Sequence, residues 1–167
     1  KNPDFLKRLV HIYGASTISV NIETAEINGK FKVFIETGRV NTDIDLHAWI
    51  DQIQECNVGE IIVTDIASEG KGKGYNIELF KDLRKRIDNQ LVAHGGAGPK
   101  ENILNLFKNC DVDAISVASL FHYHYLKADK KSELKGSNYF IHFLDEKEKR
   151  GTSIIELKKY LIDNGVK

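Results

Sequence analysis

The segment His94 to Gly98, with the sequence HGGAG, has the composition of a turn that can hold an anion. It follows a short apolar run and precedes residues at helical spacing, so its backbone N–H groups would lie near the positive end of a helix dipole. Glycine also serves tight strand-to-helix turns for steric reasons alone. The segment by itself therefore fits a phosphate site and a structural turn equally well.

A second segment of small residues, Val117-Ala118-Ser119, follows the next predicted strand and precedes another helical stretch. Barrels of eight parallel strands and eight helices often bind phosphate with the loops after strands 7 and 8 and a short extra helix. Two such segments in succession favour phosphate binding over a purely steric turn. The predicted phosphate-binding residues are Gly95, Gly96, Ala118 and Ser119.

Two carboxylates are the candidate acid–base residues. Glu23 closes one predicted strand, and Glu69 follows the next strand, which ends at Thr64. The carboxyl ends of parallel strands meet at one edge of a sheet, so the two groups can act as general acid and general base if their surroundings separate their pKa values. The alternative is a pair of ordinary surface carboxylates among the 24 acidic residues.

The histidines and cysteines do not form a recognisable metal motif. His122 and His124 are two residues apart and would splay to different sides of a helix, and neither they nor His94 have a suitably spaced Cys, Asp or Glu nearby. The histidines are expected to be structural or to lie beside the phosphate site. Cys56 and Cys110 have no CxxC spacing and are expected to be small buried thiols. We predict no metal site, no cofactor and no disulfide.

The elements that must position these residues follow from apolar periodicity. Asn28-Gly29 suits the turn of a β-hairpin near residues 25–37. Helices are predicted near 2–13, 46–53, 79–87, 99–107 and 153–164, and strands at 16–23, 60–64, 90–93 and 113–117.

Four strands that alternate with helices indicate βαβ units in a parallel sheet. Four units are too few to close an eight-stranded barrel, and a four-stranded parallel sheet with two bare edges invites a partner or a duplicate half. An open three-layer α/β sheet is the competing architecture. We expect a single domain over residues 1–167 with an insertion near 128–151. The chain opens on Lys1 and runs directly into a helix start, which suggests a piece of something longer.

The overall charge excludes some partners. Lys plus Arg and Asp plus Glu both total 24, and the run Arg84-Lys85-Arg86 fits the polar face of a helix. No nucleic-acid partner is therefore expected. The apolar runs are too short to cross a membrane and no hydrophobic leader is visible, so the sequence predicts a cytoplasmic protein without a membrane partner.

A series of motifs in order resembles the cyclase subunit of imidazole glycerol phosphate synthase, the HisF family, and in particular its C-terminal half. The matching residues are Asn2-Pro3, Ile27 to Phe31, Thr37 to Arg39, Asn41-Thr42, Gly59 to Thr64, Gly70, Gly74-Tyr75, Glu78, Gly95 to Gly98 and Ala118 to His122.

This resemblance implies a (β/α)₈ TIM barrel, a lyase of histidine biosynthesis. With ammonia from a HisH-like glutaminase subunit, such a protein converts a phosphorylated ribulosyl-aminoimidazole nucleotide to imidazole glycerol phosphate and an aminoimidazole carboxamide ribonucleotide. By position, Thr64 matches an active-site threonine and Glu60 a charged residue that gates ammonia at the glutaminase interface. The N-terminal half-barrel of the same protein is the other implied partner, and the present chain alone is expected to be inactive.

The sequence departs from the family at both carboxylates. Glu23 stands where the family has an aspartate on its fifth strand, and Glu69 where it has the catalytic aspartate of the loop after its sixth strand. The loop reads Ala67-Ser68-Glu69-Gly70-Lys71 instead of Asp-Arg-Asp-Gly-Thr. A misplacement of about 1 Å can cost on the order of 100-fold in rate. The alternative is therefore a WbuZ-like paralogue, which serves ammonia transfer in sugar amidation for surface polysaccharide.

Overall fold

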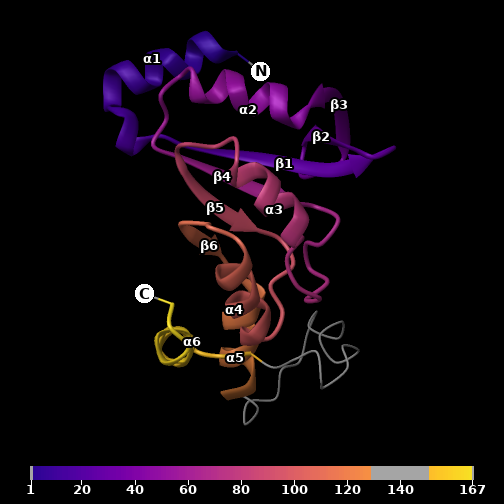
Figure 1. The fold of residues 1–167 in the computed structure, drawn as a ribbon, viewed down its shortest axis with the longest axis vertical. Helices are drawn as coiled ribbons and strands as arrows, with labels where there is room; N and C mark the ends of the chain where they lie inside the picture. The colour runs from indigo at the N-terminus through magenta and orange to yellow at the C-terminus, as the bar shows by residue number, and fades with distance from the viewer. Residues whose placement is uncertain (1, 129–150, 167) are drawn as a thin grey trace.

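The computed structural model describes residues 2–128 and 151–166; the predicted insertion lies almost wholly outside them. Figure 1 shows the elements stacked along one long axis, from α1 at one end to α5 and α6 at the other. The helices are α1 (Pro3–Tyr13), α2 (Leu46–Gln54), α3 (Ile77–Arg84), α4 (Lys100–Asn109), α5 (Ser119–Ala128) and α6 (Ile154–Asp163). The strands are β1 (Ser19–Ile27), β2 (Lys30–Ile35), β3 (Val40–Asp45), β4 (Glu60–Asp65), β5 (Gln90–His94) and β6 (Ala114–Ser116).

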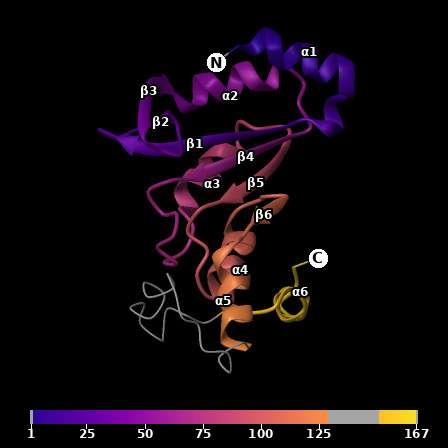
Figure 2. The same ribbon diagram turned by 180° about the vertical axis from the view of Figure 1, so that it is seen from behind.

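Within these residues the strands form one six-stranded sheet in the order β3-β2-β1-β4-β5-β6. Neighbours in the series β1, β4, β5 and β6 pair in parallel, whereas β2 and β3 are added as antiparallel strands on the β1 side. Seen from front and back, the sheet twists progressively from β1 to β6 (Figures 1 and 2). The four predicted parallel strands and the helices between them are therefore confirmed.

The start of the sheet differs from the prediction. Residues Ala15–Thr17 form a 3₁₀ turn, and β1 then runs without a break from Ser19 to Ile27, past Glu23. Asn28 and Gly29 both have positive φ values, of 50° and 78°, as a type I′ hairpin turn requires.

Strand β3 was not predicted, because its polar residues hide the two-residue alternation on which a strand prediction depends. Asn41, Thr42 and Asp43 are the second to fourth of the six residues of the strand, and Asp43 has a φ of 59°. The pairing with β2 shifts register at this point, which marks a β-bulge. A bulge interrupts the regular alternation that the sequence would otherwise display.

The two faces of the parallel sheet have different surroundings. One face carries Ile22, Ile61, Val63, Leu91 and Ala93, which are buried in one core with apolar residues of α2, α3 and α4. The paired strands place the alternate residues on the other face, which includes Asn21, Glu60, Ile62, Gln90 and Ser116 and is largely half-buried or exposed. Helices thus cover one face, and the second face carries the polar side chains.

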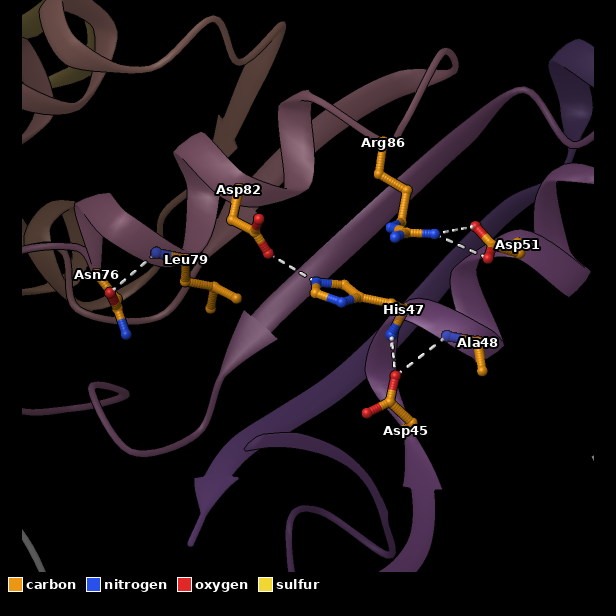
Figure 3. Close-up of polar contacts among 8 residues, drawn as sticks. All are labelled: Asp45, His47, Ala48, Asp51, Asn76, Leu79, Asp82 and Arg86. Atoms are coloured by element: carbon orange, nitrogen blue, oxygen red, sulfur yellow. Dashed lines mark hydrogen bonds and ion pairs between the residues drawn. The ribbon is translucent and has the colours of Figure 1, made fainter. Parts of the chain in front are cut away.

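Ion pairs tie successive helices together on the covered side (Figure 3). His47 on α2 lies 2.7 Å from Asp82 on α3, and Arg86 just after α3 contacts both oxygens of Asp51 on α2 at 3.0 and 2.9 Å. Arg84 pairs with Asp113 ahead of β6 at 2.9 Å. The basic run is therefore more than a solvated helix face, because two of its arginines join neighbouring βα units.

The two cysteines are buried, as expected from the sequence. Cys56 and Cys110 are free and buried, and burial raises the pKa of both thiols, so they behave as small apolar groups. In the part of the chain that the structure describes, every helix is too short or too polar to cross a membrane.

The N-terminus of α2 provides a test of helix capping. Asp45 accepts hydrogen bonds from the N–H groups of His47 and Ala48, at 3.1 and 3.3 Å, and the bond from Ala48 is the largest cause of a lowered pKa for this carboxyl. Asp45→Ala is expected to reduce the free energy of unfolding by about 1 kcal/mol at pH 7, measured by urea denaturation.

The matched variant Asp45→Asn keeps the capping oxygen without the charge. Because the folded pKa of Asp45 is below the unfolded value, its charge stabilises the fold above the unfolded pKa and loses this effect as pH falls through the folded one. The advantage of the wild type over Asp45→Asn should therefore shrink in acid. An advantage that is constant between pH 7 and pH 3 would contradict this account of the cap.

Candidate functional site

The parallel register aligns one row of side chains near the carboxyl ends of the strands. Glu23 on β1 pairs with Thr64 on β4, Thr64 with His94 on β5, and His94 with Ser116 on β6. Directly paired residues point to the same face of a sheet, and here that is the face opposite the helix-packed core. We call these four residues the mouth row.

A hydrogen-bonded chain links three side chains of this face. The Thr64 hydroxyl lies 3.0 Å from Nδ1 of His94 and donates to Oδ1 of Asn21 at 3.0 Å. Thr64 is 2% exposed, so its hydroxyl is fixed within the sheet surface, while Asn21 is exposed and His94 half-buried. Thr64, predicted as an active-site residue, thus lies between two polar neighbours.

Glu23 is connected to the hairpin region. Its Oε2 atom accepts a hydrogen bond from the N–H of Gly38 at 2.8 Å, and the side chain is half-buried. The prediction that Glu23 closes its strand is wrong, because β1 continues to Ile27 as the first arm of the hairpin. Glu23 nevertheless lies in the same row as Thr64, near the carboxyl edge of the parallel strands.

Glu69 lies in the exposed loop after β4, which Asp65 organises. Asp65 is 2% exposed, and its carboxylate accepts hydrogen bonds from the Ala67 N–H at 3.1 Å and the Ser68 hydroxyl at 2.6 Å. The Glu69 N–H donates to the Asp65 carbonyl at 3.1 Å. The two predicted carboxylates thus belong to adjacent strands, one in the sheet and one in a loop above its edge.

The glycine segment is tightly packed against this loop. The N–H of Gly74 donates to the carbonyl of Gly96 at 2.9 Å. A Cβ atom at Gly96 would clash with the Gly74 carbonyl, and one at Gly98 with the Gly72 carbonyl. Gly95 and Gly96 also have φ values of 91° and 104°. Close packing of the two loops therefore explains these glycines. The support for phosphate binding comes from the second small-residue loop and from its position at the same edge of the sheet.

The second predicted phosphate loop reaches the same edge. Because β5 and β6 are parallel neighbours with His94 opposite Ser116, the segments that follow them leave the sheet side by side. Ser119 is the first residue of α5, and the N–H of His122 donates to the Ala118 carbonyl at 3.1 Å. The structure thus brings Gly95, Gly96, Ala118 and Ser119 to one edge, with a helix N-terminus among them.

Two further residues, Glu60 and Tyr75, do not belong to the mouth row. Glu60 begins β4 at the opposite edge of the sheet, where its carboxylate accepts a hydrogen bond from the Ser19 hydroxyl. The hydroxyl of Tyr75 is buried beyond the loop after β4, and burial raises its pKa above the ordinary range, which keeps it protonated. Glu60 is therefore remote from the mouth row along the strand, and Tyr75 is not an acid–base group at neutral pH.

The structure adds Asn21 and Asp65 to the residues that the sequence identifies. Asn21 lies two residues before Glu23, so strand alternation already places both on one face. Asp65 follows Thr64 directly and therefore points to the other face, where it holds the loop of Glu69. Among the described residues no three His, Cys, Asp or Glu side chains form a group that could hold a metal ion.

Two hollows on the helix-covered side do not include the mouth row. One, of about 280 Å³, lies between α1, α2 and the first three strands, and another, of about 720 Å³, borders α3. The mouth row instead lies on the second face of the sheet, which helices α2 to α4 do not cover. These features define an α/β chain with a polar site at the carboxyl edge of four parallel strands.

Comparison with known proteins identifies the family. The family model described as "Histidine biosynthesis protein" matches residues 1–127, and the chain belongs to this family. It is 31% identical over 140 residues to the imidazole glycerol phosphate synthase subunit HisF of Bacillus cereus (strain Q1), covering 83% of this chain and 56% of that protein. It is 32% identical over 143 residues to the HisF subunit of Hydrogenobaculum sp. (strain Y04AAS1), covering 84% and 57%.

The HisF subunit of Prochlorococcus marinus (strain AS9601) is 32% identical over 144 residues, which cover 84% of this chain and 54% of that protein. The chain thus spans about half the length of the curated relatives it matches. The family match and the observed alternation of strands and helices confirm the predicted fold class, a partial (β/α)₈ barrel.

The contact between the two loops can be tested by adding one methyl group. Gly96→Ala is expected to lower the free energy of unfolding by several kcal/mol, because the Cβ meets the Gly74 carbonyl and φ is 104°. Gly70→Ala is the matched control, since Gly70 also has a positive φ, of 70°, but no atom lies within 4 Å of the position that a Cβ would take there. Equal losses for the two variants, measured by urea denaturation, would mean that close packing of the loops contributes little.

Proposed function

We propose that the chain is the C-terminal half of a HisF-type cyclase subunit of imidazole glycerol phosphate synthase. In this proposal the complete protein uses glutaminase-derived ammonia to form imidazole glycerol phosphate and aminoimidazole carboxamide ribonucleotide in histidine biosynthesis. The observation that carries it is the match to the histidine biosynthesis protein family over residues 1–127 together with the mouth row at the carboxyl edge. Parallel α/β enzymes collect their active sites at this edge.

The catalytic roles follow from position. Glu69 is proposed as the general acid, because it lies in an exposed loop that Asp65 holds above the carboxyl edge. Glu23 is proposed as the general base or orienting carboxylate, since one of its oxygens is engaged by the Gly38 N–H and the other is not part of that bond. Thr64 would orient groups between them through its fixed hydroxyl.

The phosphate of the substrate is proposed to bind between Gly95-Gly96 and Ala118-Ser119. The N-terminus of α5 supplies backbone N–H groups and the positive end of a helix dipole, both of which favour a phosphate. The adjacent glycine turn lets the main chain come close without side chains in between. This is a proposal for one of the substrate's phosphate groups.

Two protein partners belong to the proposal. An N-terminal half-barrel of the same protein would continue the sheet and enclose the polar face on which Asn21, Thr64 and His94 lie. A glutaminase subunit would dock at the opposite edge, where Glu60 begins β4, and pass ammonia through the barrel. Both are supported by the resemblance to HisF subunits, which are about twice as long as the matched region.

The proposed acid–base role is tested with the full-length protein, the ribulosyl-aminoimidazole nucleotide and an ammonium salt, which replaces the glutaminase. Glu69→Gln is expected to lower kcat by about 100-fold or more at unchanged substrate affinity, as for loss of a general acid. The matched control is Glu55→Gln, an exposed carboxylate just after α2 at the other end of the β4 strand. Wild-type activity in Glu69→Gln would overturn the assignment, and product formation is followed chromatographically.

A second function is favoured by the two glutamates. Glu23 and Glu69 stand at positions where the HisF family has aspartates. Glu23 also accepts a hydrogen bond from the Gly38 N–H, in the segment after β2. This supports an alternative in which the protein is a WbuZ-like ammonia-transfer partner in sugar amidation for surface polysaccharide, with altered or no cyclase activity. Both functions require ammonia and a glutaminase.

Restoring aspartate distinguishes the two functions. If the protein is a repurposed relative, the full-length Glu23→Asp/Glu69→Asp variant should stay as inactive toward the nucleotide as the wild type. A gain in cyclase activity of about tenfold or more in the double variant would instead indicate a cyclase site that lacks only correct carboxylate placement. Circular dichroism and the urea midpoint of each variant serve as controls for folding.

A further inference from the structure

We propose that Thr64 and Asn21 hold His94 in its Nδ1–H tautomer, so that Nε2 is a proton acceptor at the mouth of the barrel. His94 would then be a further catalytic residue of the same site. The catalytic part of this inference rests on the proposed function; the tautomer does not. From the sequence, His94 is expected to be structural or to lie beside the phosphate, and the hydrogen bonds around it suggest a sharper role.

The direction of the hydrogen bonds determines the tautomer. The Thr64 hydroxyl has one proton, and it donates this proton to Oδ1 of Asn21 at 3.0 Å. With the amide oxygen of Asn21 turned toward Thr64 in this way, the contact at 3.0 Å between the same hydroxyl oxygen and Nδ1 of His94 has Nδ1–H as its donor. A neutral imidazole with a proton on Nδ1 has a lone pair on Nε2. Nε2 is thus left as a base.

The surroundings place this base where a substrate would bind. His94 is the last residue of β5, immediately before Gly95, and its side chain is half-buried in the mouth row beside Ser116. Thr64 is 2% exposed and cannot move without disturbing the sheet, so the imidazole is held by a rigid partner. A ligand whose phosphate lies at the glycine turn would therefore bind next to the imidazole.

The proton transfer is balanced within the proposed reaction. When ammonia adds to a carbonyl carbon of the substrate, the nitrogen lone pair forms the new C–N bond and the carbonyl π electrons move to oxygen. The nitrogen then carries a positive charge, and Nε2 of His94 takes one of its protons. Glu69, the proposed general acid, protonates this oxygen to a hydroxyl. The imidazolium keeps Nδ1–H on Thr64 and gives its Nε2 proton to the hydroxyl, which leaves as water, and the iminium nitrogen that remains returns one proton to the Glu69 carboxylate.

Three variants of the full-length protein separate this role from a structural one. His94→Asn keeps an N–H donor for Thr64 but has no base, and we expect kcat with ammonium salt to fall about 100-fold. His94→Ala should fall as far and recover at least about tenfold when imidazole is added to the assay. Thr64→Val, which removes the hydroxyl with little change of shape, should lower kcat more than it raises KM, because Thr64 acts by positioning His94.

The outcomes distinguish this proposal from the proposed function. Full activity in His94→Asn, or no recovery of His94→Ala with imidazole, would overturn the catalytic role of His94.

Absence of turnover in the wild type would count against the proposed function, and the tautomer remains testable by ¹⁵N NMR of the imidazole in the full-length protein. The Nδ1–H tautomer should be the dominant form in the wild type and should no longer dominate in Thr64→Val. A dominant Nε2–H form in the wild type would overturn the assignment.

Discussion

The parallel pairing of β1, β4, β5 and β6 is the constraint on which the rest of the structure depends. Because side chains alternate between faces with a period of two, the register that pairs Glu23 with Thr64 and Thr64 with His94 also sends Ile22, Val63 and Ala93 into the helix-covered core. A slip of one residue would exchange the polar row for the apolar one. Burial of the core therefore fixes the composition of the site.

This coupling explains how much could be predicted from the sequence. Helices α2, α3 and α4 and strands β4 and β5 have strong apolar patterns, because each buries one face, and their positions were predicted to within a few residues. The helix predicted near 153–164 is α6, and Ser153 and Glu156 form a capping box at its start with both hydrogen bonds present. Periodicity is informative wherever burial is one-sided.

The remaining features depend on contacts between segments that are distant in sequence. Strand β3 is stabilised by pairing across a bulge, which no local pattern reveals. The hydrogen bonds of Glu23 to Gly38 and of Thr64 to Asn21 and His94 join residues 15, 43 and 30 positions apart. The position of the glycine turn was predicted correctly. The loop after β4 packs closely against this turn and explains its glycines, but that contact could not be predicted from the sequence of the turn alone.

The hydrogen bonds of Glu23 and His94 concern one of the two departures from the family pattern, the glutamate at position 23. A glutamate side chain extends one methylene farther than aspartate, and in this chain the extended carboxylate accepts the Gly38 N–H of the segment between β2 and β3. A carboxylate engaged in this way joins β1 to the segment between β2 and β3. His94 is held at Nδ1 by Thr64, and among the described residues no hydrogen bond is made by its second ring nitrogen. In the proposed site, Glu23 then serves as the orienting carboxylate, and His94 supplies the proton acceptor within the same row of the sheet.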